Sequence, residues 1–186
     1  MSVFLLIVSI LLWIASLVAL PKRPFYAPAL AFLGLLCMSF CKSADGIQWL
    51  PINGPMLYSW LSISLVVMIA TILQPVDVRT STEGMPYIMG GAFVGLAVGL
   101  LGYSATSEES MLYGIMAIAV IAGIFFGYLV YSRTPAGRGH WPGSGNFINY
   151  LLAKGFPTAV TVIQIGLIFV LLILVSNLPQ PNPLQP

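Results

Sequence analysis

The sequence MPYIMGGAFVGLAVGLLGY, residues 85–103, decides the fold class because it contains no charged side chain. A helix of about 20 apolar residues is long enough to cross a hydrocarbon core about 30 Å thick. Inside a bilayer, a helix satisfies its backbone N–H and C=O groups internally, whereas an isolated strand cannot. We therefore expect this segment to be a transmembrane helix.

Further apolar stretches of similar length lie on both sides of this segment. Together they predict six transmembrane helices, at residues 3–20, 25–41, 56–73, 85–103, 111–131 and 158–175. The composition agrees, because 59% of the 186 residues are hydrophobic and 6% are charged, against about 25% charged in soluble domains. The stretches lack the polar–apolar alternation of membrane-barrel strands. The expected fold is an all-α integral membrane protein, a single polytopic domain.

The cationic residues predict how the chain threads the bilayer. Lys and Arg in short loops stay on the cytoplasmic side, and Asp and Glu contribute little to this sorting. We number the connections between the predicted helices in chain order. The odd-numbered connections hold six of the seven Lys and Arg residues, namely Lys22, Arg23, Arg79, Arg133, Arg138 and Lys154. Lys42 alone lies in an even-numbered connection. We therefore expect both termini outside, in the cytoplasmic membrane of a bacterium or archaeon.

The longer connections fit this topology. Residues 42–55 predict an outer turn, with Trp49 at the membrane interface, that is either a plain turn or a segment that dips back. Residues 132–157 predict a long cytoplasmic loop, in which residues 147–154 are compatible with a helix along the inner surface. Residues 178–186 are rich in proline and predict an extended extracytoplasmic tail.

The second and third predicted helices resemble the fourth and fifth. PFYAPALAFLGLL, residues 24–36, repeats the order of Pro, Tyr, small residues and Gly found in residues 85–101, and PMLYSWLSISLVVMIATI, residues 55–72, resembles SMLYGIMAIAVIAGIFFG, residues 110–127. Both pairs lead into Arg-Thr. The pattern indicates a parallel repeat of a two-helix hairpin, with chance similarity between apolar runs as the alternative.

Glycines predict how the helices pack. A regular four-residue spacing recurs in two predicted helices, at Gly91, Gly95 and Gly99 and again at Gly123 and Gly127. Such a glycine zipper lets two backbones approach closely, either within the chain or between subunits. We expect the helix at residues 85–103 to be central. The helix at residues 158–175 has bulky side chains nearly all round, which favours exposure to lipid or to a hydrophobic partner.

Polar groups within the predicted helices are few. Gln164 is the most deeply placed amide, with Thr158 and Thr161 on a nearby face, and we interpret it as one side of an interhelical hydrogen bond rather than a substrate ligand. Cys37 and Cys41 lie four residues apart in one helix, where a disulfide would need distortion, so we expect reduced core residues.

The sequence indicates no catalytic residue, metal site or cofactor. His140, the sole histidine, lies in a predicted inner loop, whereas the two cysteines lie toward the opposite membrane face. That separation is incompatible with one metal site, and a single histidine excludes a bundle-buried haem with two axial histidines.

The inner loop holds the candidate contact residues for a lipid head group or other anion. They are Arg133, Arg138, His140, Trp141, Ser144 and Asn146. Arginine offers a fork for phosphate oxygens, and glycine-rich backbone can turn N–H groups toward an anion. The stretch 143–146, GSGN, resembles a fragment of the phosphate-binding motif of bacterial membrane glycerol-3-phosphate acyltransferases, although residues 148–151 depart from it.

These observations favour a non-catalytic membrane subunit that packs within a larger complex and helps assemble or stabilise it. One alternative is a small carrier or channel for a neutral or lipidic solute. Another is a lipid head-group transferase that uses residues 133–146. We expect membrane lipids and other integral membrane subunits as partners, and no nucleic acid, because the net charge is only +2.

Overall fold

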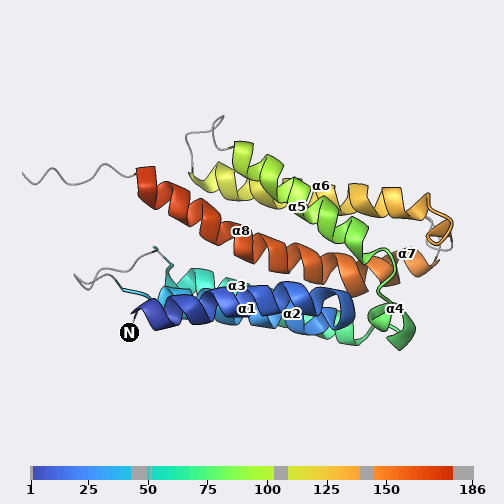
Figure 1. Ribbon diagram of the computed structural model, residues 1–186, viewed down its shortest axis with the longest axis horizontal. Helices are drawn as coiled ribbons and strands as arrows, with labels where there is room; N and C mark the ends of the chain where they lie inside the picture. Colours follow the sequence, from blue (N-terminus) through green and yellow to red (C-terminus); the bar gives the residue numbers. More distant parts are fainter. Residues whose placement is uncertain (1, 43–49, 51, 103–108, 139–144, 178–186) are drawn as a thin grey trace, which may run out of the picture.

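The computed structural model describes residues 2–42, 50, 52–102, 109–138 and 145–177, and its regular elements are helices (Figure 1). They are α1 (Ser2–Lys22), the 3₁₀ turn η1 (Pro24–Tyr26), α2 (Ala27–Ser39), α3 (Gly54–Ile72), α4 (Val76–Thr80), α5 (Met85–Leu101), α6 (Glu109–Ser132), α7 (Gly145–Tyr150), the π-helical turn η4 (Leu151–Gly155) and α8 (Phe156–Asn177). The tail predicted at residues 178–186 lies outside the described residues.

Four helical stretches in the described part of the chain are long and apolar enough to cross a membrane. They are Val3–Lys22, Gly54–Ile72, Tyr113–Ser132 and Asn146–Val175. Two further apolar stretches, Pro24–Ser39 and Met85–Leu101, are helical but shorter. The regular structure of the described residues is thus all-helical, with four candidate spans there compared with six predicted for the chain. The proline that opens η1 separates this part of the chain from α1, and the proline in the first turn of α2 is at a position where a helix tolerates it.

The helices form two layers joined by α8. Figure 1 shows α1, α2 and α3 on one side, the α5–α6 pair on the other, and α8 crossing between them. Helix α8 contacts α1, α2, α3, α5 and α6. In its most apolar stretch, 72% of the residues are buried, compared with 17% of the residues in the corresponding stretches of α1 and α3. The expectations of a last helix exposed to lipid or to a hydrophobic partner, and of a central helix at residues 85–103, are therefore wrong, because the bulky side chains of α8 pack between the layers of this chain.

Glycines bring α5 and α6 into backbone contact. A Cβ atom at Gly91 would meet the carbonyl group of Gly123, and one at Gly127 would meet the carbonyl oxygen of Tyr87. A Cβ atom at Gly99 would lie 2.7 Å from the Cα atom of Met116. Because any side chain at these positions would push the helices apart, the small residues set the distance between them.

The helix ends divide into two groups. The end of α1, helix α4, the end of α6 and α7 lie at one end of the molecule, whereas α1 begins and α8 ends at the other (Figure 1). We call the first the basic end; its cationic residues are Lys22, Arg23, Arg79, Arg133, Arg138 and Lys154.

Residues 145–157 differ from the loop predicted for them, because α7, η4 and α8 form one continuous helical stretch. The side chains of this segment have partners to pack on. The ring of Phe147 lies 5.1 Å from that of Tyr128, and Tyr150 stacks on Tyr131 with ring centroids 5.8 Å apart. These contacts hold the segment against α6.

Candidate functional site

The π-helical turn η4 buries a lysine at the basic end. Lys154 has no exposed surface, and its Nζ atom donates hydrogen bonds to the main-chain oxygens of Arg79, at 2.7 Å, and Pro21, at 3.4 Å. An ammonium group is costly to bury, and these hydrogen bonds offset part of that cost. Through them Lys154 connects η4 to the end of α1 and to α4.

The sequence analysis placed Lys154 in the loop predicted at residues 132–157, so its burial was not predicted. Proline lacks an N–H and clashes with the carbonyl group four residues earlier, so it ordinarily ends a helix. Here the wider π-helical turn precedes it and the helix continues. The signal that could have predicted a continuous helix is the helix-compatible sequence at residues 147–154, which lies just before the apolar stretch at residues 158–175.

An aromatic cluster lies beside Lys154. The hydroxyl group of Tyr150 donates a 2.6 Å hydrogen bond to the main-chain oxygen of Glu83. The next residue, Gly84, has φ of 72°, and a Cβ atom there would lie 2.7 Å from the ring of Tyr131. Only glycine adopts this backbone conformation easily and also leaves room for the rings. The turn before α5 is therefore fixed against α6 and α7.

Hydrogen bonds join α8 and η4 to α3. The Nε2 atom of Gln164 donates to Ser64 Oγ at 2.8 Å, which confirms the interhelical hydrogen bond predicted for Gln164. Nearer the basic end, Thr71 Oγ1 donates to the main-chain oxygen of Leu152 at 3.3 Å. Gln164 Oε1 and Thr161 Oγ1 are buried with no hydrogen-bond partner among the described residues. One hydrogen bond thus joins α3 to α8 and another joins α3 to η4.

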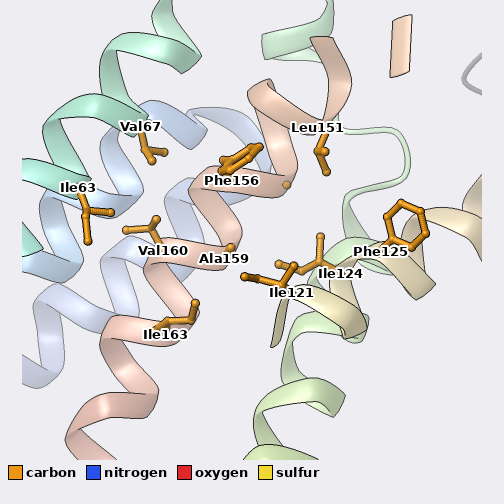
Figure 2. Close-up of a pocket in the computed structure, with 11 residues that line it drawn as sticks. Ile63, Val67, Ile121, Ile124, Phe125, Leu151, Phe156, Ala159, Val160 and Ile163 are labelled. Carbon is orange, nitrogen blue, oxygen red and sulfur yellow. The ribbon is translucent and has the colours of Figure 1, made fainter. Parts of the chain in front are cut away.

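An apolar groove opens on the other side of α8, between α3 and α6. Its volume is about 340 Å³. Figure 2 shows its side chains, which come from α3, α6, η4 and α8. The groove is lined by Ile63, Val67, Ile121, Ile124, Phe125, Leu151, Gly155, Phe156, Ala159, Val160 and Ile163. Val160 and Ile163 are buried in its floor, while Ile121 and Phe125 are exposed at its rim. Sequence reasoning did not predict this groove, because it forms between helices distant in the chain.

The anion-contact residues predicted from sequence fall into two groups. Arg133 and Arg138 are exposed at the basic end, just after α6, and Asn146 is exposed in α7. His140, Trp141 and Ser144 lie outside the described residues. Within the described ranges, no group of three or more His, Cys, Asp and Glu residues is placed to hold a metal ion.

No protein-family model, curated protein or solved structure was found to match this chain.

Proposed function

We propose that the chain is a non-catalytic membrane subunit that packs against other integral membrane proteins and helps hold a larger complex together. In this proposal six helices cross the cytoplasmic membrane, α2 and α5 included, and both termini lie outside. The α2–α3 and α5–α6 hairpins are then parallel copies of one unit, each leading into an Arg-Thr pair on the inner side.

The supporting observation is an exposed face of α3 that carries small polar residues. Ser59 and Ser62 are exposed, and each hydroxyl group donates a 2.9 Å hydrogen bond to a main-chain oxygen of its own helix, that of Pro55 or Tyr58. The face continues at helical spacing through exposed Val66 and Ile69 to Leu73. We call Ser59, Ser62, Val66, Ile69 and Leu73 the α3 face.

Small and hydroxyl-bearing residues favour contact with another helix over contact with lipid. A flat helix surface lets a second backbone approach and gain dispersion energy that mobile lipid chains do not match. Each serine oxygen also keeps capacity to accept a hydrogen bond from a partner. The opposite face of α3, at Ser64 and Thr71, is already bonded to α8 and η4. Helix α3 therefore fits between the core of this chain and a neighbouring subunit.

The experiment is purification of a tagged chain from its host in mild detergent. We expect one or more integral membrane proteins to co-purify in fixed stoichiometry, and Ser59→Leu with Ser62→Leu to release them. The matched control is Ala15→Leu, which adds the same bulk to an exposed position of α1. Recovery of the wild-type chain as a lone monomer would contradict the proposal. Equal loss of partners in the control variant would show that the α3 face is not the surface that binds them.

A further inference from the structure

We infer that the groove between α3, α6 and α8 holds one acyl chain of an anionic phospholipid, with the phosphate of that lipid at the basic end. This site lies on a different face of α3 from the proposed subunit contact and does not depend on it.

The lining and size of the groove fit a hydrocarbon chain. Its side chains are all apolar, and its volume of about 340 Å³ is at the lower end of the range for ligand sites. A helix with its side chains is about 10–12 Å in diameter, whereas a single unbranched acyl chain is much thinner. The groove therefore fits a lipid tail better than a transmembrane helix.

The groove has a direction along the bundle. Leu151 and Phe156 lie at the end near α7, and Ile163 lies about two helical turns further along α8. Figure 2 shows Leu151 and Phe156 on the same side of the groove, away from Ile163. On α6, Arg133 follows Phe125 by about two turns, which places it about 12 Å beyond the groove along the helix axis. A lipid with its tail among these residues has its head group at the level of Arg133.

The charge at that level selects an anionic head group. Lys22, Arg23, Arg133 and Arg138 are all exposed at the basic end. The carboxylates in the described connections there are those of Asp77 and Glu83. Basic clusters at the ends of membrane helices attract anionic lipids. A zwitterionic head group would gain much less from the same residues, so the site discriminates by charge as well as by shape.

Native mass spectrometry of the purified chain, titrated with phosphatidylglycerol or with phosphatidylcholine of identical acyl chains, tests both parts of the inference. We expect one tightly held phosphatidylglycerol per chain. Ala159→Phe, which fills the groove, should weaken its binding at least tenfold, whereas Ala15→Phe on α1 should not change it. Arg133→Gln should lower the preference for phosphatidylglycerol about fivefold, the effect of one basic residue near an anionic surface. Lys42→Gln, at the opposite end, should preserve that preference.

Two results would overturn the inference: unchanged phosphatidylglycerol binding by folded Ala159→Phe, or equal binding of the two lipids by the wild type. A photo-reactive residue in place of Ile121, in the host membrane, provides a readout that does not require the filled groove to fold. A phospholipid adduct supports the inference. A protein adduct at this position in place of lipid shows that a neighbouring helix occupies the groove.

Discussion

The Nζ atom of Lys154 lies 2.7 Å from the main-chain oxygen of Arg79, which is 75 residues earlier in the chain. The same ammonium group reaches Pro21 at the end of α1. Among the described residues, these two main-chain oxygens are the acceptors of its side chain. The lysine therefore joins three separate segments by hydrogen bonds that do not depend on the side chains of its partners.

Replacing Lys154 should destabilise the basic end in an order set by volume and charge. Lys154→Met keeps most of the volume and should cost about 1–2 kcal/mol for the lost hydrogen bonds. Lys154→Ala also leaves a cavity and should cost about 2–4 kcal/mol. Lys154→Glu places a carboxylate against carbonyl oxygens and should be the least stable. Thermal unfolding of the purified variants in one detergent measures this order. A glutamate variant as stable as the methionine variant would show that the site is open to water.

Alanine at the contacting glycines should separate α5 from α6. The new methyl group in Gly91→Ala or Gly123→Ala would meet a backbone carbonyl group, which cannot rotate away, so we expect a loss of about 1–3 kcal/mol. Gly90 and Gly114 serve as controls on the same two helices, because a Cβ atom at either would meet no atom of another described helix within 4 Å. Alanine at the controls should be neutral or stabilising by up to about 1 kcal/mol. Equal effects at all four positions would mean that helix propensity, not packing, is being measured.

The hydrogen bond between Gln164 and Ser64 should give a measurable coupling energy. In a double-mutant cycle with Gln164→Leu and Ser64→Ala, we expect a coupling of about 0.6 kcal/mol, the typical value for interhelical hydrogen bonds within membranes. Unfolding free energies of the two single variants and the double variant supply the cycle. Fully additive losses would show that the bond contributes nothing beyond the packing of each side chain.

Alanine at Gly84 should loosen the turn before α5. The left-handed backbone and the rings of Tyr131 and Tyr150 both oppose a side chain there, so Gly84→Ala should cost about 1–3 kcal/mol. Hydrogen exchange of the amides in α4 and at the start of α5 should accelerate more than exchange in α1. Uniform acceleration would assign the effect to global stability instead of this turn.

Cysteine labelling tests the proposed orientation. In a background with Cys37 and Cys41 replaced by Ser, a membrane-impermeant maleimide should label Asn53→Cys in intact cells. It should reach Thr80→Cys only after permeabilisation, because positive residues hold that connection inside. Both wild-type residues are exposed: Asn53 caps the start of α3, and Thr80 ends α4, which follows the other end of α3. Reversed labelling would contradict the orientation, and labelling of both in intact cells would show that α3 does not span the membrane.

The helical fold was readable from sequence because long uncharged runs leave the backbone few alternatives in a membrane. The interhelical bond of Gln164 was readable for a similar reason, since a deeply placed amide requires a partner. The burial of α8 was not readable from sequence, because a helix with bulky apolar residues on all sides has the same hydropathy whether it faces lipid or a protein core. The burial of Lys154 was not predicted, because a proline such as Pro157 normally ends a helix. The π-helical turn η4 instead runs directly into α8. The groove depends on α3, α6 and α8 meeting in space, which no local pattern encodes.

The position of α8 between the two layers also bears on how the protein is made. The ribosome completes α1, α2, α3, α5 and α6 before α8 leaves the exit tunnel, so both layers are synthesised before the element that contacts them both. Until then, the hydroxyl group of Ser64 and the main-chain oxygens of Arg79 and Pro21 lack their partners on α8 and η4. The arrival of η4 and α8 is therefore the synthesis step that joins the two helical groups into one fold.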